Sequence, residues 1–197
     1  MGKIFCVMGK SSSGKDTIYR MLLQNTDLHL AKVVLYTTRP IRANEKEGRE
    51  YFFVDIKRQE ELQKAGKVIE LRTYETVHGP WSYFTVDDGQ ICLEEKNYLM
   101  ITTLEAYEKI REYFGEDSII PIYIEVEDGV RLQRALDREK LEKEPKYAEL
   151  CRRFLADAAD FSEEKLLHAG ISLRFNNEEL GKICEEITKY IQAILQK

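Results

Sequence analysis

The chain has 197 residues, of which 43% are hydrophobic and 33% are charged, and its formal net charge at neutral pH is −5. This length suffices for one α/β domain with insertions and a sizeable core, and the negative charge argues against a nucleic-acid partner. No apolar run approaches the roughly 20 residues of a membrane span and no hydrophobic leader precedes the first strand, so we expect a cytoplasmic protein without membrane association.

The first predicted elements are a buried strand over residues 4–8 and a helix over 16–24, joined by a Gly/Ser-rich loop. Four residues separate Gly9 from Gly14 and Lys15 follows directly, which is the spacing of a loop that cradles triphosphates. Backbone N–H groups would point into one concavity, the helix would add its positive end, and Lys15 would supply a cation. The alternative is an ordinary turn, but the flanking strand and helix favour the phosphate loop.

One position departs from this motif, which requires Ser or Thr after the lysine as a magnesium ligand. This chain has Asp16 there, and Thr17 carries a hydroxyl one residue later. The carboxylate would either bind Mg²⁺ directly or repel phosphate and weaken ATP binding, and the sequence leaves both open. We expect the loop to bind ATP, with Asp16 as the candidate metal ligand, through Gly9, Ser11, Ser12, Ser13, Gly14, Lys15, Asp16 and Thr17.

The middle of the chain differs in pattern from both ends. It predicts a short buried strand over 32–36, a charged loop over 39–51, a short helix over 56–65, a strand over 67–74, and a turn into a second strand over 78–86. Asp-Asp-Gly-Gln at 87–90 predicts a hairpin turn into a further strand at 91–93. We therefore interpret 38–93 as a small β-rich insertion.

The parallel-sheet alternation then returns, with a strand over 97–101, a helix over 104–114 and a strand over 119–126. An arginine-bearing helical region over 130–161 is a candidate lid, and a strand over 171–175 and an amphipathic helix over 180–195 end the chain. This predicts an α/β P-loop fold of three layers, α/β/α, with a parallel central sheet, a core of 1–37 and 94–197, and a lid at about 131–155. The four cysteines lack metal-ligand spacing and are predicted to be free.

Four stretches resemble the guanylate kinase family. They are the phosphate loop; Thr37-Thr38-Arg39-Pro40-Ile41-Arg42 with Glu45, Gly48, Tyr51 and Phe53; Glu70 followed by Tyr83 and Thr85; and Arg134-x-x-x-Arg138 and Arg152-Arg153-Phe154 with Asn177-Glu178-Glu179-Leu180. The resemblance implies transfer of the γ-phosphate of ATP to GMP, with Mg²⁺ as cofactor, GMP bound by the insertion 38–93, and a monomer or homodimer.

The resemblance also implies roles for individual residues. Lys15, Arg138, Arg152 and Arg153 would be catalytic, and Asn177 would lie near adenine. Arginine forks suit phosphate and a carboxylate suits the N1–H and 2-amino donors of guanine, so Arg39 would hold the phosphate and Glu70 would read the base. The implied GMP-binding residues are Thr38, Arg39, Arg42, Tyr51, Glu70, Tyr83, Thr85 and Thr103.

Two further departures lie in the expected base site. Thr103 replaces the aspartate of the family's Ile-Asp-x-Gln-Gly, and Phe84 replaces a glycine in a tract with one extra residue. Two alternatives therefore remain: a kinase for another nucleoside monophosphate or small phosphorylated acceptor, and a non-enzymatic guanylate-kinase-like interaction module. Lys15 and the two glycines favour an enzyme, because a scaffold has no physical need of a phosphate loop.

Overall fold

The computed structural model describes residues 1–76 and 79–196, so the start of the turn predicted at 78 lies outside the described residues. Five parallel strands form the central sheet in the order β2-β7-β1-β8-β9. Their bounds are β1 Ile4–Met8, β2 Leu30–Lys32, β7 Asn97–Ile101, β8 Ile119–Glu125 and β9 Arg174–Asn176. β1 is the middle strand of this sheet and is fully buried. The loop that follows it therefore lies midway along the edge formed by the carboxyl ends of the strands.

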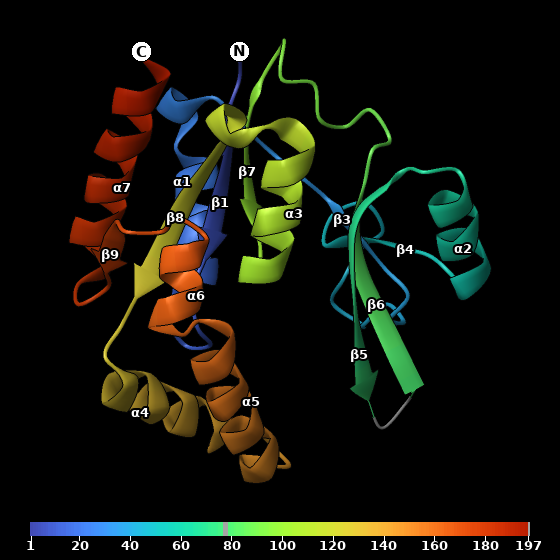
Figure 1. The fold of residues 1–197 in the computed structure, drawn as a ribbon. Coiled ribbons are helices and arrows are strands. Elements are labelled where there is room, and N and C mark those ends of the chain that lie inside the picture. The colour runs from blue at the N-terminus through green and yellow to red at the C-terminus, as the bar shows by residue number, and fades with distance from the viewer. Residues whose placement is uncertain (77–78, 197) are drawn as a thin grey trace.

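Helices cover both faces of the central sheet (Figure 1). Ile4 and Cys6 share one apolar cluster with α3 (Leu104–Phe114) and α6 (Glu163–His168), whereas Phe5 and Val7 share another with α1 (Lys15–Gln24) and α7 (Leu180–Leu195). This division follows from the alternation of side chains along a strand. It confirms the predicted three-layer α/β/α fold.

A second, four-stranded sheet has the order β4-β3-β6-β5 and stands beside the core (Figure 1). Its strands are β3 Leu35–Thr37, β4 Tyr51–Phe53, β5 Val68–Thr76 and β6 Gly79–Val86, and α2 Ile56–Lys64 accompanies them. Phe84, Val86 and Leu62 form its small buried core. Strands β5 and β6 form a long antiparallel hairpin.

Two helices, α4 (Asp128–Glu139) and α5 (Tyr147–Asp160), project below the central sheet in Figure 1, at the end where β1 runs into the phosphate loop. They correspond to the helical region predicted as a lid. Short 3₁₀ helices at Thr26–Leu28 and Glu116–Ser118 precede β2 and β8. In the described part of the chain, every helix is too short or too polar to span a membrane.

Three predicted elements were wrong in detail. The strand predicted over 32–36 is two strands in different sheets, since the chain passes from β2 to β3 through the buried Val33 and Val34. No strand forms at 91–93, because Gln90 bonds Val34 and the Leu93 carbonyl accepts from Gly2. The helix α6 was not predicted, and the last strand lies three residues later than expected.

Candidate active site

The phosphate loop connects β1 to α1 and is held from behind by a buried asparagine. Gly14 has a φ of +85° at the start of α1, and a Cβ there would lie 2.5 Å from Nδ2 of Asn177. That same nitrogen donates to the Ser13 carbonyl over 2.8 Å. Asn177, predicted to lie near adenine, therefore supports the loop with its side chain, and only glycine fits where the two approach.

The charged end of the loop contains Lys15 and Asp16, the first residues of α1. The Lys15 ammonium lies 3.5 Å from Oδ2 of Asp16, and 73% of the Asp16 side chain is exposed. A carboxylate oxygen is a ligand that Mg²⁺ prefers, and this ion is commonly held by one or two carboxylates, phosphates and water. The exposed carboxylate of Asp16 would therefore be available to hold a magnesium ion beside a bound nucleotide.

The helices α4 and α5, predicted to form a lid, are tied to the phosphate loop by Arg131, which is only 1% exposed. Its Nη1 donates to the Ser11 carbonyl over 2.9 Å, its Nη2 lies 2.7 Å from Oδ1 of Asp128, and its guanidinium stands over the Phe154 ring. Asp157 of α5 accepts from the Ser11 N–H over 2.7 Å. Burial alone would raise the pKa of Asp128, but Arg131 lowers it below its ordinary value.

Sequence reasoning missed this connection. It counted Arg131 only among the arginines of the region and gave no role to Asp157. The spacing of Asp128 and Arg131, three residues apart on a helix, is the signal that pairs those two. Nothing in the sequence pattern places Asp157 against Ser11.

The predicted lid arginines lie in two environments. Arg134 donates to the Asn177 carbonyl over 3.3 Å and Arg138 reaches Oγ of Ser12 over 3.5 Å, so both approach the loop region. Arg152 forms a bidentate pair with Glu149 on the surface of α5. Arg153 lies 3.7 Å from Glu149 and also lines a small cavity with Ser12 and Arg138.

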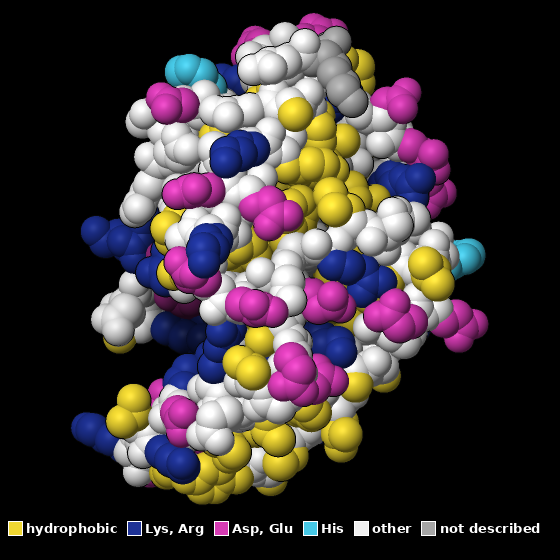
Figure 2. Space-filling model, turned by 90° about the vertical axis from the view of Figure 1, so that its left-hand side faces the viewer, with side chains coloured by type: hydrophobic (Ala, Val, Ile, Leu, Met, Phe, Trp, Pro, Cys, Tyr) yellow, Lys and Arg dark blue, Asp and Glu magenta, His cyan; other side chains and the backbone are white. Residues whose placement is uncertain are grey.

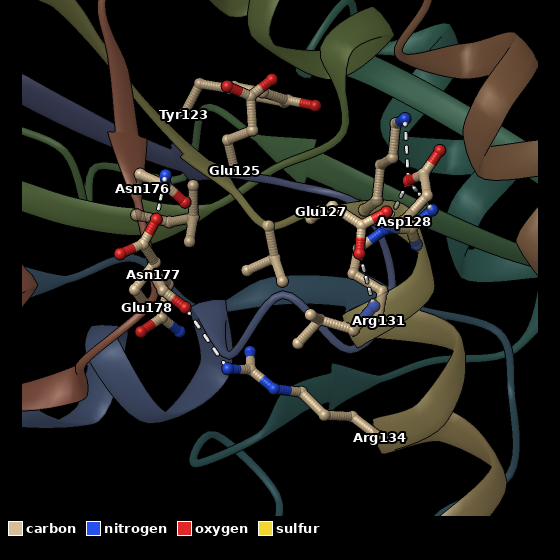
Figure 3. A pocket seen from close by; sticks show the side chains of 13 residues that line it. Tyr123, Glu125, Glu127, Asp128, Arg131, Arg134, Asn176, Asn177 and Glu178 are labelled. Carbon is tan, nitrogen blue, oxygen red and sulfur yellow. Dashed lines mark hydrogen bonds and ion pairs between the residues drawn. The ribbon is translucent and has the colours of Figure 1, made fainter.

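A cavity of about 640 Å³ adjoins the phosphate loop on the donor side (Figure 3). Figure 3 shows Arg134 reaching across from α4 toward Asn177, with Arg131 and Asp128 on the α4 side. Figure 2 shows a hollow between the body and the lower lobe of the molecule, where Lys and Arg side chains gather. The cavity is lined by the ends of β8 and β9 and by the start of α4, through residues including Lys10, Tyr123, Glu125, Glu127, Val130 and Glu178.

The second sheet contains the residues predicted for the acceptor phosphate. Arg39 is 3% exposed; it pairs with both oxygens of Glu45 at 2.9 and 2.7 Å and lies over the Tyr51 ring at 5.6 Å. Hydrogen bonding to Arg39 lowers the pKa of Glu45. Tyr51 and Tyr83 meet edge to face. The structure therefore brings Arg39, Tyr51 and Tyr83 together.

Arg42 and Thr38 flank this group. The Arg42 side chain is exposed, and its backbone N–H donates to Glu45 over 2.9 Å. The Thr38 hydroxyl accepts from the Ser82 N–H of β6 over 2.9 Å, which fixes the loop against the sheet. Thr38 thus contributes to the position of Arg39 through the backbone.

The residues predicted to read the base form a network with an arginine that the sequence analysis did not single out. Glu70, whose side chain is fully buried, lies 2.8 and 3.2 Å from Arg72 and accepts from the Thr85 hydroxyl over 2.7 Å. Arg72 also donates to Oγ1 of Thr103 over 3.3 Å. Burial alone would lower the pKa of Arg72, but the charge and hydrogen bonds of Glu70 raise it. Strand alternation places Arg72 and Glu70 on one face, and this was the available signal.

Phe84 does not line this site. It is fully buried in the small core of the second sheet, with its ring 5.5 Å from that of Tyr36. The expectation that Phe84 lies in the base site is therefore wrong, because neighbouring strand residues point to opposite faces. Thr85, the next residue, is the one that faces Glu70.

The sequence model of the guanylate kinase family matches residues 1–194. The chain belongs to the guanylate kinase family. It is 26% identical over 200 residues to the guanylate kinase of Porphyromonas gingivalis, covering all of both chains, and 31% identical over 157 residues to that of Chlorobium chlorochromatii, covering 72% of this chain and 80% of the relative. The crystal structure of the Anaplasma phagocytophilum guanylate kinase matches with a TM-score of 0.68 at 21% identity, over all of this chain and 87% of the other, and so shows the same fold.

Membership confirms the predicted family and the predicted class of enzyme, an ATP-dependent phosphotransferase. Guanylate kinases in general use ATP with Mg²⁺ and phosphorylate GMP. The roles of individual residues in this chain follow from the geometry described above and are proposals.

Proposed function

We propose that this chain transfers the γ-phosphoryl group of ATP to GMP, with ATP bound at the phosphate loop and GMP bound by the second sheet. The observation that carries this proposal is the pairing of two anion sites: Lys15 at the N-terminus of α1, and the Arg39, Tyr51 and Tyr83 group of the second sheet. A P-loop alone would hold one triphosphate. A second anion site of this kind suits a phosphorylated acceptor.

On the donor side, the N-terminus of α1 and the loop N–H groups would bind the β- and γ-phosphates, and the cavity beside Arg134 and Asn177 would take the adenosine. Lys15 would stabilise the charge that develops on the migrating group. Asp16 would hold the Mg²⁺ ion of the nucleotide; when bound, that ion neutralises phosphate charge and orients the phosphates.

On the acceptor side, Arg39 would bind the GMP phosphate. Its fork is already oriented by Glu45, so little side-chain entropy is lost when a phosphate binds. The attacking group is a phosphate oxygen that is already anionic, so no general base is required. Catalysis then depends on positioning and on cations.

The lid residues complete the site. We assign 38–93 as the acceptor-binding segment and about 131–155 as the lid. Arg138 lies beside Ser12 and Arg153 lines the same small cavity, whereas Arg152 pairs with Glu149 on the surface of α5. Rotation of α5 toward the loop would bring Arg152 as well to the transferred phosphate and exclude water from the site.

A coupled assay of ADP release with ATP, Mg²⁺ and GMP tests this function. The wild type should release ADP only when GMP is present, and Lys15→Met should reduce kcat by at least about 100-fold, since it removes the cation from the migrating phosphoryl group. Lys189→Ala, on the exposed face of α7, is the matched control and should retain activity. A wild type that is neither active with GMP nor thermally stabilised by ATP with Mg²⁺ and by GMP would overturn the proposal.

A further inference from the structure

Glu70 is already occupied by donors from its own chain. A carboxylate offers about four lone-pair positions. Oε1 accepts from the Thr85 hydroxyl over 2.7 Å and from Nη2 of Arg72 over 3.2 Å, and Oε2 accepts from Nε of Arg72 over 2.8 Å. One position therefore remains, on Oε2. Guanine offers two adjacent donors, N1–H and the 2-amino group, so Glu70 can accept only one of them in this arrangement.

The second residue implied to accept a hydrogen bond from the base is Thr103, which has a hydroxyl where the family has a carboxylate. Thr103 begins α3, and its hydroxyl accepts from the Ala106 N–H over 3.3 Å and from Nη1 of Arg72 over 3.3 Å. A hydroxyl has two acceptor positions, and both are used. What Thr103 still offers to a ligand is its O–H, a donor, and a donor cannot accept the amino hydrogens of guanine.

Arg72 connects the two effects. It holds Glu70 from one side and Thr103 from the other, its side chain is only 9% exposed, and its charge balances a fully buried carboxylate. Breaking this pair to free Glu70 would leave an uncompensated buried charge, so the pair resists displacement by a neutral base. The site keeps an acceptor for N1–H and gains donors that suit carbonyl oxygens.

We propose that Arg72 and Thr103 make the acceptor site indifferent to the 2-amino group, so that it accepts 6-oxopurine nucleoside monophosphates as a class, IMP as well as GMP. This inference rests on the proposed phosphotransferase function. Hypoxanthine has the N1–H and the 6-oxo group of guanine and lacks only the 2-amino group. Adenine has a lone pair at N1 in place of the N1–H, so AMP in the same orientation sets an acceptor against the free position on Glu70 and is rejected.

The test is the ratio of kcat/KM for GMP to that for IMP, measured by coupled ADP release on the wild-type chain, with AMP as the third acceptor. A site that reads a buried amino group discriminates by about one to two orders of magnitude. We expect a ratio below tenfold, with AMP at least 100-fold worse than either. A ratio above tenfold, or AMP turnover equal to that of IMP, would overturn the inference while leaving the phosphotransferase intact. Absence of ADP release with every acceptor would instead overturn the proposed function, and this inference with it.

Variants assign the effect to these two residues. The double substitution Arg72→Ala and Thr103→Asp frees Glu70 and supplies a second carboxylate, so the GMP preference should rise by at least tenfold. Thr103→Asp alone retains a good helix cap and the Arg72 partner of Glu70, and serves if the double variant does not fold. Its GMP preference should also rise. Arg58→Ala on α2, an exposed arginine paired with Glu61, is the control and should leave the ratio unchanged. Folded variants with the wild-type ratio would contradict the role given to Arg72 and Thr103.

Discussion

Arg39 is a buried cation whose neighbours fix the orientation of its guanidinium. Its guanidinium lies between a bidentate carboxylate and the rings of Tyr51 and Phe53, each 5.6 Å away. An arginine side chain stays charged in proteins whatever its partner, and the hydrogen bonds of Glu45 only raise the pKa of Arg39 further. The aromatic rings stabilise the cation without competing for its N–H donors. Orientation, rather than charge, is therefore what Glu45 contributes.

Glu45→Gln should weaken GMP binding selectively. The amide retains the shape of the side chain but loses the bidentate charged pair, so Arg39 samples other orientations before it meets the phosphate. We expect the KM for GMP to rise by about tenfold while the KM for ATP changes by less than twofold, as measured by coupled ADP release. Glu61→Gln, whose carboxylate pairs with the exposed Arg58, is the matched control. An equal rise in both KM values would contradict the assignment of Glu45 to the acceptor site.

The Arg39–Glu45 pair should make the free energy of unfolding depend on pH. The folded-state pKa of Glu45 lies below its ordinary value because it accepts hydrogen bonds from Arg39. The stability from this pair is then complete above the unfolded-state pKa and is lost as the pH falls through the folded-state pKa. The difference in unfolding free energy between wild type and Glu45→Gln should therefore be constant from about pH 6 to 8 and shrink below about pH 4. Urea titrations across this range would measure it, and a difference that grows on acidification would contradict the pairing.

At the scale of elements, Arg131 is a buried contact between the lower helices, α4 and α5, and the phosphate loop, in addition to the contacts of Arg134, Arg138 and Asp157. Arg131 binds the Ser11 carbonyl, Asp128 and the Phe154 ring, and its side chain is 1% exposed. Arg131→Met should lower the free energy of unfolding by about 3 kcal/mol, because it removes the charged hydrogen bonds of a buried guanidinium and its contact with the Phe154 ring. The exposed Arg152→Ala, which removes a surface pair, should cost less than about 0.5 kcal/mol. Similar urea midpoints for the two variants would show that Arg131 does not anchor the lid.

The elements that the sequence predicted well are those with strong local signals. β1, α1, α3 and α7 each have an apolar period or a Gly/Ser boundary, and their burial matches the prediction. The passage from β2 to β3 was missed because an apolar run at 33–35 looks the same whether it stays in one sheet or changes sheets. The strand expected at 91–93 failed because long-range bonds to Gln90 and Gly2 override local β propensity.

In the candidate site, too, residues with a local sequence signal could be predicted and long-range contacts could not. The motif residues Lys15, Arg39 and Glu70 could be assigned a place from spacing and family resemblance. The link from Arg72 to Thr103 and that from Asp157 to Ser11 could not, since these partners are far away in the chain. Such contacts depend on how β5 meets α3 and how α5 meets the phosphate loop, and a single sequence does not contain that geometry.

At the scale of the whole molecule, the second sheet meets the core through both polar and apolar contacts. The hydrogen bond from Arg72 to Thr103 links β5 with the start of α3, and the Tyr113 hydroxyl donates to Asp87 at the far end of the same helix. Leu35 of β3 and Ile69 of β5 also pack against the apolar cluster that contains α3. Movement of the second sheet relative to α3 would therefore have to replace apolar as well as polar contacts.

We expect the central sheet and the helices on its two faces to unfold as one unit. Cys6 and Cys184 lie in the apolar clusters on opposite faces of this sheet and can be used to test this. Cys6 is fully buried on the α3 side, and burial raises the pKa of its thiol to about 12. Cys184 of α7 is 8% exposed on the other side, and burial also raises the pKa of its thiol. Because the thiolate is the reactive form, neither should react in native protein, whereas the exposed Cys151 should react at once. In a Cys92→Ser, Cys151→Ser background, the labelling rates of Cys6 and Cys184 should rise with the same dependence on urea, since one sheet packs both layers. Labelling of Cys184 at urea concentrations that leave Cys6 protected would instead show that α7 opens separately from the sheet.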